Sequence, residues 1–393
     1  MRILQIHNMY ALRGGEETVV ENERKLLNDN GHIVEQYIQD NRAIESFSIP
    51  DKISLVSNAI WSRQSYNDLT SKIKTFKPDI CHLHHFYPLL SPSVVDACTD
   101  QNIPLVMTLH SYRLICTNSM LFRDGAVCTE CIGRSLYHSV KRKCYRNSYF
   151  HTFHLAHTIE KARKRNVWDK SISRFIALTH FGKKLFVQGG LPEEKILVKP
   201  NFSHKPDILI TPSNDNYLLY FGRLDPLKGF DLVMKAAQTL PEYHFVVAGT
   251  GPLQSELESL YLSNLEYMGL LQQDRLNELI SKASMILFTS RSFEGMPSII
   301  PESFALGKTI LASDIGVIPE LIRNGETGIL FQAGSLHDLI EKIRWSMNHP
   351  TELRQMGDKA FQEFKEKYSP EVAYQQLISI YQEAIETYIT PKK

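Results

Sequence analysis

Short apolar runs alternate with amphipathic stretches along most of the chain, and this alternation occurs in two blocks. The apolar runs predict strands in the first block at residues 2–6, 32–38, 79–83, 104–109 and 174–178. They predict strands in the second block at residues 217–221, 244–248, 265–268, 285–288, 309–311 and 328–331. The amphipathic stretches of the first block predict helices at residues 17–30, 57–76, 91–99, 149–165 and 181–188. Such alternation is typical of parallel sheets covered by helices on both faces.

The two blocks predict an α/β protein with two Rossmann-like domains. Residues 199–213 lie between the blocks, hold three prolines and show no periodicity, so we interpret them as a linker. The predicted domains are then residues 1–198, with an insertion at 111–147, and residues 214–369. Ligands of open parallel sheets bind beyond the carboxyl ends of the strands. Two such domains facing each other therefore predict a cleft that holds the functional site.

The composition is that of a globular protein. The chain has 393 residues, of which 43% are hydrophobic and 22% charged, and these values exclude disordered, collagen-like and coiled-coil proteins. We find no apolar run of membrane-spanning length and no signal-peptide pattern at the first residues, so we expect a cytoplasmic protein. The net charge of +1 is low for a protein that coats a polyanion, and we expect no nucleic-acid partner.

One segment departs from this overall neutrality. Residues 134–165 hold nine basic side chains and a single acidic one, Glu160. A solvated basic face is one interpretation of this segment. A surface that meets anionic lipid head groups or a phosphorylated substrate is the other. The second interpretation predicts peripheral contact with the inner face of a cell membrane.

The segment SRSFEGMPSIIPESFALG, residues 290–307, follows a predicted strand and begins a helix. If Ser298 is the N-cap, Pro301 lies in the first turn, where its missing N–H costs nothing. The unpaired N–H groups of residues 295–299 then suit an anion. Glu294 and Glu302 would hold hydroxyl groups of two sugars on either side of a diphosphate. Two surface glutamates at the start of a helix are the alternative.

Two further segments follow predicted strands. In FGRLDPLKGF, residues 221–230, Arg223 and Lys228 precede a helix and could clamp a diphosphate, although a solvated loop has the same pattern. In LRGGEETV, residues 12–19, the pair Gly14 and Gly15 allows a ligand to approach the backbone closely, although a plain turn would also use it. The latter segment lacks the GxGxxG pattern of ordinary dinucleotide-binding sites.

FGRLDPLKGFD, VVAGTGPL and the long segment from SFEGMPS to GETGILF together resemble the family 4 glycosyltransferases. This family comprises retaining, nucleotide-sugar-dependent enzymes with the two-domain GT-B fold. The resemblance covers nearly the whole carboxyl half of the chain. The segments GGEE, TLH at residues 108–110 and VKPN at residues 198–201 extend it into the first half.

The resemblance implies roles for individual residues. Arg223 and Lys228 would bind the donor diphosphate, Glu294 the donor hexose and Glu302 the ribose. His110 would stand near the reacting carbon, and we expect it to act in catalysis with Glu294, Arg223 and Lys228. The other donor-binding residues would be Gly14, Gly15, Gly249, Gly251, Met268, Gly269, Gly295, Met296, Pro297 and Ser298. The family often has an aromatic residue in place of Met296, and this difference concerns donor preference. In the resembling fold the helix at 370–393 crosses back to the first domain, and we expect the same here.

Histidines gather at the ends of two predicted strands. His110 ends the strand at 104–109, and a buried structural histidine is the alternative to its catalytic role. His82, His84 and His85 occur at the end of the strand at 79–83. Alternation along a strand places His82 and His84 on one face. We expect these three side chains to contribute to acceptor binding.

The insertion contains four of the six cysteines, with the spacing C-x11-C-x2-C-x12-C. A structural Zn²⁺ would hold together a loop that lacks its own core, although packed thiols or disulfides remain alternatives. The cysteines concerned are Cys116, Cys128, Cys131 and Cys144. The insertion also resembles a subset of the family from bacterial surface-polysaccharide pathways. This resemblance implies a lipid-linked saccharide as the acceptor.

These patterns predict a retaining transfer of a hexose from a nucleotide-diphosphate sugar to a saccharide. No Asp-x-Asp pair occurs in the sequence, so we expect no catalytic metal. We expect same-face attack, with the departing diphosphate stabilised by basic side chains and helix N-termini. A sugar-nucleotide epimerase on the same fold is one alternative. A zinc-stabilised nucleic-acid-binding protein, using the basic segment 134–165, is an alternative of another class.

Overall fold

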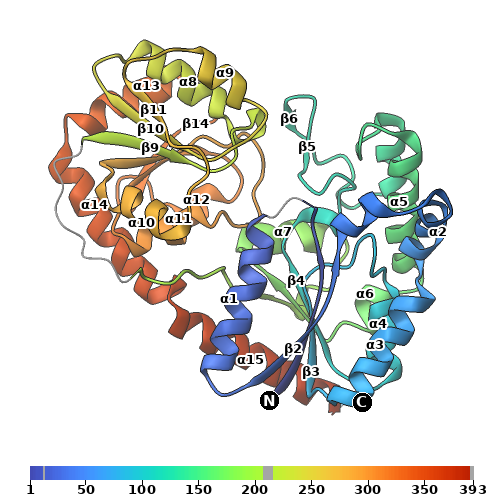
Figure 1. Cartoon of the computed structure of the whole chain (residues 1–393). Helices are drawn as coiled ribbons and strands as arrows, with labels where there is room; N and C mark the ends of the chain where they lie inside the picture. The colour runs from blue at the N-terminus through green and yellow to red at the C-terminus, as the bar shows by residue number, and fades with distance from the viewer. Residues whose placement is uncertain (12–13, 207–215, 390–393) are drawn as a thin grey trace. The chain divides into compact units, whose positions relative to one another are not determined.

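The computed structural model describes residues 1–11, 14–206 and 216–389 and divides into two compact units (Figure 1). Unit 1 comprises Met1–Leu121, Thr129–Pro200 and Ala373–Lys393, and unit 2 comprises Phe122–Cys128 and Asn201–Val372. Residues 207–213 of the predicted linker lie outside the described residues, as do Leu12, Arg13 and the last four residues of the predicted terminal helix.

Unit 1 is built on a six-stranded sheet with the order β2-β1-β3-β4-β7-β8. All its neighbouring strands are parallel. The strands are β1 (Arg2–Met9), β2 (Ile33–Asp40), β3 (Ile80–Leu83), β4 (Leu105–Leu109), β7 (Arg174–Ala177) and β8 (Ile196–Val198). Its main helices are α1 (Gly15–Asp29), α2 (Ile49–Ile60), α3 (Arg63–Phe76), α4 (Ser93–Asp100), α5 (Tyr149–Lys164), α6 (Val167–Lys170) and α7 (His180–Gln188).

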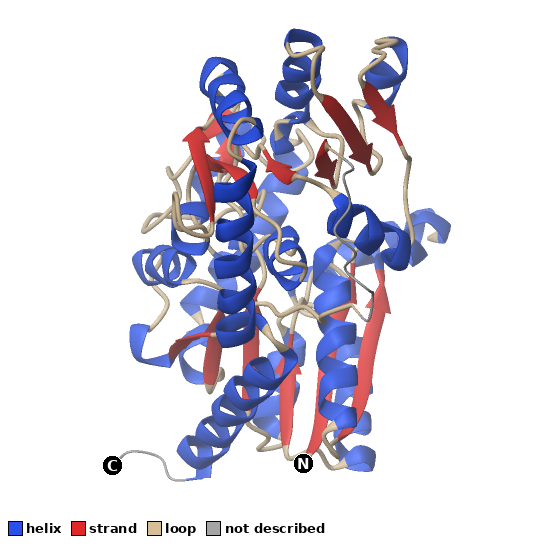
Figure 2. Cartoon of the chain, turned by 90° about the vertical axis from the view of Figure 1, so that its left-hand side faces the viewer, coloured by secondary structure: helices blue, strands red, loops and turns tan. Residues whose placement is uncertain are grey.

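Unit 2 is also built on a six-stranded parallel sheet, with the order β11-β10-β9-β12-β13-β14. The strands are β9 (Tyr217–Phe221), β10 (His244–Ala248), β11 (Leu265–Tyr267), β12 (Met285–Phe288), β13 (Ile310–Asp314) and β14 (Gly328–Gln332). The helices are α8 (Phe230–Thr239), α9 (Gln254–Ser259), α10 (Gln273–Lys282), α11 (Ile299–Ala305), α12 (Ile318–Leu321), α13 (Leu336–Met347) and α14 (Pro350–Glu363). The inner strands of both sheets are buried, whereas the edge strands β2, β8 and β11 are largely half-buried or exposed. Helices lie beside both sheets (Figure 2). The predicted fold class, two Rossmann-like α/β domains, is confirmed.

One predicted helix differs from the structure, and one short strand was missed. The single helix expected at 57–76 is two helices, because Trp61 is extended (φ −159°) and the side chain of Ser62 caps the next helix by accepting a hydrogen bond from the Ser65 N–H. The strand β8 was not predicted. It has only three residues, and two of them are half-buried, so its apolar pattern is too short to stand out.

The last helix, α15 (Pro370–Ile389), packs against the sheet of unit 1. Leu377, Ile380 and Tyr381 share one buried cluster with Ile3 of β1 and Ile80 of β3. The Tyr381 hydroxyl also forms a 2.7 Å hydrogen bond with His82 Nδ1. The expectation that the terminal helix crosses back to the first domain is therefore confirmed. None of the helices formed by the described residues is long and apolar enough to cross a lipid bilayer.

The strand orders determine where ligands are expected. In unit 2 the chain first builds outward from β9 to β11 and then crosses to β12, so the order reverses between the neighbours β9 and β12. In unit 1 the corresponding reversal lies between β1 and β3. In open parallel sheets, ligands bind beyond the carboxyl ends of the strands at such switch points. The loops that follow β9, β12, β1 and β3 are therefore the places to search for function.

Candidate functional site

In unit 2 the loops after β9 and β12 are bonded to each other. The hydroxyl of Thr289, which follows β12, donates to the carbonyl oxygens of Lys228 and Gly229, both at 3.0 Å. Gly229 has a φ of +66°, and a Cβ at this position would lie 1.9 Å from the Thr289 carbonyl oxygen. Only glycine allows this approach, since any side chain would push the two loops apart. The backbone thus fixes the position of the Lys228 side chain relative to the loop after β12.

Lys228 and Glu294, predicted from two separate motifs, form an ion pair. The Lys228 Nζ lies 2.7 Å from Glu294 Oε1 and 2.9 Å from Oε2. The Ser290 hydroxyl donates to Glu294 Oε1 at 2.7 Å. The Lys228 side chain is 32% exposed and the Glu294 side chain 14%. The ammonium group is therefore held in a defined place while part of it still faces solvent, as binding of an anionic ligand requires.

Arg223 occupies the same edge of the sheet but is held less firmly. Its guanidinium donates to Asp225 Oδ2 at 3.0 Å, and its side chain is 62% exposed. An exposed pair of this kind contributes little to stability, about 0–1 kcal/mol. Arg223 can therefore turn toward a ligand at small energetic cost, in contrast to Lys228.

The segment 295–302 forms the start of the short helix α11, with Ser298 at the predicted N-cap position. The Ser298 side chain makes no capping hydrogen bond to the backbone. Burial raises the pKa of the Glu302 carboxyl to about 7, and a hydrogen bond from Ser298 opposes that rise. Met296 is buried, and its sulfur lies 2.9 Å from the backbone N of Asn201. Gly295 and Pro297 are half-buried in the preceding loop.

The predicted nucleoside-side glycines have a clear structural task. Gly249 has a φ of +135°, and a Cβ there would lie 1.8 Å from the Gly222 carbonyl oxygen. A Cβ on Gly251 would lie 2.5 Å from the Leu224 carbonyl oxygen. Gly269, which directly follows Met268, also has a positive φ, of +64°. Its carbonyl oxygen accepts from the Gly249 N–H at 2.8 Å. These glycines pack the loops after β9, β10 and β11 closely together, and their contact with a nucleoside stays a prediction.

In unit 1 a buried polar network lies beneath the switch point. Glu23 of α1 and Lys199 form an ion pair of 2.8 Å, with side chains only 2% and 1% exposed. His82 joins this network, since its Nδ1 lies 3.7 Å from Glu23 Oε2 and its Nε2 bonds to the Thr108 hydroxyl at 2.7 Å. His82 is fully buried, so any influence on an acceptor must pass through its neighbours.

His84 and His110 form a neutral pair at the carboxyl edge of the same sheet. His84 Nδ1 and His110 Nε2 lie 3.0 Å apart, so one ring donates a hydrogen bond to the other. Burial, together with neighbouring histidines, lowers the pKa of both rings well below the ordinary value. Burial likewise lowers the pKa of His85. His110 is half-buried, so a neutral imidazole stands at this edge, able to exchange a hydrogen bond with a hydroxyl group but not to act as a cation.

The loop after β1 brings further polar groups to this place. The Glu17 carboxylate accepts from the Gly14 N–H at 2.8 Å and from the Tyr10 N–H at 2.9 Å, and so holds Tyr10 close to the start of α1. Glu16 and His7 lie close together, with 3.7 Å between His7 Nδ1 and Glu16 Oε1. Burial lowers the pKa of His7 to about 4 and raises the pKa of Glu16 well above its ordinary value.

Several buried polar atoms at this edge have no hydrogen-bond partner among the described residues. They are His7 Nδ1 and Nε2, Glu16 Oε1, His84 Nε2, His85 Nε2 and Arg113 Nε. The side chains of Glu16, His84, His85, His110 and Arg113 line one small cavity. Unsatisfied buried polar groups are costly, about 1–3 kcal/mol each, and such a cluster is typical of a place that a ligand completes.

Glu23, His82 and His84 have the spacing of a metal site, since their ligand atoms all lie within 4.8 Å of one another. The surroundings argue for a hydrogen-bond network instead. The ammonium group of Lys199 already neutralises Glu23, and both ring nitrogens of His82 are engaged by hydroxyl groups. A cation would have to displace these partners, so we assign no metal here.

The four cysteines of the insertion do not form a comparable group within the described part of the chain. The Cys116 thiol is buried and donates to Asn118 Oδ1 at 2.9 Å, while Cys128, Cys131 and Cys144 are half-buried. The zinc site stays a prediction. If it exists, elemental analysis of the purified protein should give about one zinc per chain, because a tetrahedral site takes one ion. Purified protein without zinc would contradict it.

The sequence interpretation did not include Glu23, Glu16 or His7. A signal for Glu23 was present, because it falls on the apolar stripe of α1 between Val19, Val20 and Leu26. A glutamate on a buried helix face requires a buried partner. That partner is Lys199, which the sequence analysis includes only as part of the VKPN segment.

Two family models match the chain. The model described as Glycosyltransferase Family 4 matches residues 13–202. The model described as Glycosyl transferases group 1 matches residues 202–363. The first match corresponds to most of unit 1 and the second to most of unit 2.

Individual relatives agree with these matches. A sulfoquinovosyl transferase of Arabidopsis thaliana is 23% identical over 76% of this chain and 56% of its own length. A D-rhamnosyltransferase of Pseudomonas aeruginosa is 26% identical over 39% of this chain and 42% of its own length. The chain spans about half the length of the curated relatives it matches.

Solved structures show the same fold. The crystal structure of HepE from Anabaena in complex with UDP has a TM-score of 0.65 at 17% identity, covering 96% of this chain and 99% of that one. Sucrose-phosphate synthase from Thermosynechococcus elongatus has a TM-score of 0.71 at 13% identity, covering 98% and 99%. With both halves matched by glycosyltransferase models and both sheets arranged as described, the chain belongs to the family 4 glycosyltransferases with the GT-B fold.

Proposed function

We propose that this chain is a retaining glycosyltransferase that moves a hexose-type sugar from a nucleotide-diphosphate sugar to a saccharide acceptor. The acceptor is lipid-linked, and the product contributes to a surface polysaccharide such as a capsule, an exopolysaccharide or an O-antigen. The Lys228–Glu294 pair at the switch point of unit 2 carries this proposal. It presents a cation for a phosphate directly beside a carboxylate that can accept hydrogen bonds from sugar hydroxyl groups.

The donor class is supported by the solved relatives. HepE from Anabaena has been crystallised with UDP, with UDP and glucose, and with UDP-glucose. The side chains of this chain fit such a donor, because Arg223 and Lys228 offer two positive charges at the carboxyl end of β9. These charges offset the negative charge that develops on the departing diphosphate, so no catalytic metal is required.

Retention of configuration is what the resemblance to the family implies, and the state of Glu294 argues against one of the two routes to it, a double displacement. A double displacement needs a carboxylate free to attack the anomeric carbon. Glu294 is instead engaged by Lys228 through both oxygens and by the Ser290 hydroxyl. We therefore assign it to binding sugar hydroxyl groups. The acceptor hydroxyl attacks from the face on which the diphosphate leaves, and neutral His110 accepts or donates a hydrogen bond at a sugar hydroxyl.

A thermal-shift panel of nucleotide sugars tests this function. One nucleotide sugar is expected to stabilise the protein, by about 2.7 kcal/mol at a hundred times its dissociation constant, while oligonucleotides have no effect. A control variant, Lys228→Ala, should lose most of the shift. Stabilisation by oligonucleotides alone would favour the nucleic-acid-binding alternative. Conversion of the bound sugar without an acceptor would favour the epimerase.

Peripheral membrane contact is the second part of the proposal. Beside the basic residues of segment 134–165, helix α5 exposes three aromatic side chains and α2 exposes two isoleucines. They are Tyr149 at 57%, Phe150 at 57%, Phe153 at 50%, Ile49 at 76% and Ile53 at 68%. Exposed aromatic and aliphatic side chains beside lysines and arginines are typical of surfaces that rest on anionic lipid. An acceptor embedded in the membrane would then be within reach.

The structure also narrows the set of basic residues available for such contact. Arg165 donates to Asp96, and Arg163 donates to Glu160 and to the Leu114 carbonyl oxygen. Lys141, Lys161 and Lys164 are exposed, and Lys143 is half-buried over the ring of Tyr149. The lysines are thus better candidates for lipid contact than the two engaged arginines.

Sedimentation with liposomes tests the membrane contact. Wild-type protein should pellet with anionic but not with neutral vesicles and should be released at ~0.5 M salt, because screening acts over about 8 Å at physiological ionic strength. Replacing Lys141, Lys161 and Lys164 by serine should strongly reduce pelleting. Replacing Lys235, Arg275 and Lys282 of unit 2 removes as many charges and should not. Equal pelleting on both vesicle types would contradict the proposal and favour a soluble acceptor.

A further inference from the structure

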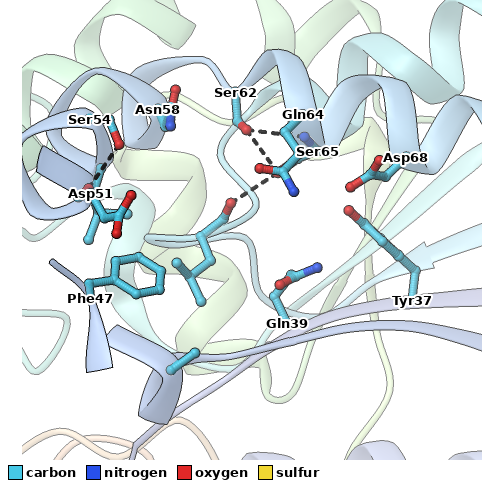
Figure 3. A pocket seen from close by; sticks show the side chains of 13 residues that line it. Tyr37, Gln39, Phe47, Asp51, Ser54, Asn58, Ser62, Gln64, Ser65 and Asp68 are labelled. Atoms are coloured by element: carbon cyan, nitrogen blue, oxygen red, sulfur yellow. Dashed lines mark hydrogen bonds between the residues drawn. The ribbon is translucent and has the colours of Figure 1, made fainter. Parts of the chain in front are cut away.

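A second pocket lies within unit 1, formed by β2, the segment that follows it, α2 and α3 (Figure 3). Its cavity volume is about 420 Å³, within the ~300–1,000 Å³ of typical ligand pockets. None of the sequence motifs discussed above contributes a residue to it. The pocket is therefore a feature that the proposed chemistry leaves unexplained.

Part of the polar lining of this pocket is available to a ligand, whereas Asp51 accepts from the Ser48 hydroxyl and the Ser65 hydroxyl donates to Ser62. The Tyr37 hydroxyl is buried and has no hydrogen-bond partner among the described residues. Figure 3 shows it pointing toward the carboxylate of Asp68, and burial followed by that nearby charge raises the pKa of Tyr37. The side chains of Gln39 and Asn58 line the pocket from β2 and from α2 and are half-buried. Donors and acceptors thus face the cavity from opposite sides.

The rest of the lining limits the ligand class. None of the 13 lining residues is basic, while Asp51 and Asp68 are both acidic. An anionic ligand, such as a phosphate or a uronic acid, would meet repulsion without any compensating cation. The two aspartates come from different helices and are not part of a group with metal-ligand spacing among the described residues. The aromatic ring of Phe47 adds an apolar surface at one side (Figure 3).

Amides, hydroxyl groups, carboxylates and an aromatic ring around a cavity of this size suit a neutral, polyhydroxylated molecule. We propose that this pocket binds one neutral pyranose unit of the acceptor saccharide, an inference that rests on the proposed glycosyl transfer. Asp68 and the amides of Gln39 and Asn58 hold the sugar hydroxyl groups, and Tyr37 supplies one donor. The pocket thereby selects acceptors whose bound sugar carries no negative charge.

Saturation-transfer NMR on the full chain tests the proposal without requiring transfer. The probes are the methyl pyranosides of glucose, galactose, mannose and N-acetylglucosamine, with methyl glucuronide as the charged counterpart. At least one neutral glycoside should give a signal that is at least tenfold stronger than that of the glucuronide. Asn58→Trp fills the pocket and should reduce the neutral signal at least tenfold. Its neighbour Ser57 is exposed and does not line the pocket, so Ser57→Trp is the matched control.

The outcomes separate this proposal from the proposed function. If Asn58→Trp does not fold, Gln39→Ala removes an amide without adding bulk and should lower the signal about fivefold. The proposal that this pocket binds a neutral pyranose would be overturned by any of three results. These are an unchanged signal in the folded variants, no signal with wild-type protein, and an equal signal from the glucuronide. Stabilisation by a nucleotide sugar is measured separately in the same samples. A glycoside signal without stabilisation by any nucleotide sugar would support saccharide binding in the pocket and contradict the proposed glycosyl transfer.

Discussion

Replacing Glu294 or Lys228 by alanine is expected to lower the rate of glycosyl transfer at least ~100-fold while the protein keeps its fold. Each side chain holds the other at 2.7 Å, so either change removes one ligand contact and also releases the partner. A mobile Lys228 no longer stands where the departing diphosphate develops charge. Steady-state kinetics with the donor identified by thermal shift, together with circular dichroism, measure the effect.

The pair is also expected to behave as a unit. The double variant Lys228→Ala/Glu294→Ala should lose little more activity than either single variant, since each already removes the arrangement. The exposed pair Lys282–Glu278 of α10 provides the control, with 2.7 Å between the charged atoms in the same unit. Its alanine variants should keep near-normal turnover. Near-normal turnover of a folded Lys228 or Glu294 variant would contradict the assignment.

Lys199→Ala is expected to lower the free energy of unfolding of unit 1 by about 3–5 kcal/mol, because it leaves the Glu23 carboxylate buried without its cation. Both side chains are almost fully inaccessible to water, and Glu23 also lies 3.8 Å from His84 Nε2. The neighbouring histidines, His82 and His84, do not readily supply the positive charge lost with Lys199, since burial holds the pKa of His82 at about 4. Denaturant unfolding monitored by far-ultraviolet circular dichroism measures the loss.

The exposed pair Lys72–Glu35 is a matched control for this prediction. It has the same 2.8 Å separation, but its side chains are 30% and 45% exposed. Lys72→Ala should therefore cost less than about 1 kcal/mol. Replacing both buried partners, as Lys199→Met/Glu23→Leu, should recover most of the lost stability because no unpaired charge remains. Equal losses for Lys199→Ala and Lys72→Ala would show that the buried pair has no special role.

Most of the fold could be predicted from the sequence because parallel strands buried on both faces read as short apolar runs. The strands β9, β10 and β12 have the bounds that those runs predict. The sequence-based prediction fails where a strand is only partly buried, or where the conformation of a single residue ends a helix. Strand β8 is too short for a pattern, and the break between α2 and α3 depends on the extended backbone of Trp61.

The sequence predicted which loops carry the candidate site, but not which of their side chains touch one another. Lys228 and Glu294 were selected from motifs 66 positions apart, and that they touch depends on β9 and β12 being neighbours, which the sequence order does not reveal. The Glu23–Lys199 pair joins residues still farther apart. The saccharide pocket is built from polar side chains without a repeating pattern, so only the folded chain brings Tyr37 and Asn58 to one cavity.

The position of α15 has a consequence for how the protein is made. The sheet of unit 1 is encoded by residues 2–198, but Leu377, Ile380 and Tyr381, which cover part of it, come after the whole of unit 2. A ribosome has therefore synthesised the whole of the second unit before the first can close its core. Until then the buried cluster around Ile3 and Ile80 lacks the side chains that α15 contributes, and apolar surface left uncovered in this way makes a newly made chain prone to aggregation. Expression of the amino-terminal half alone would preserve this vulnerable intermediate.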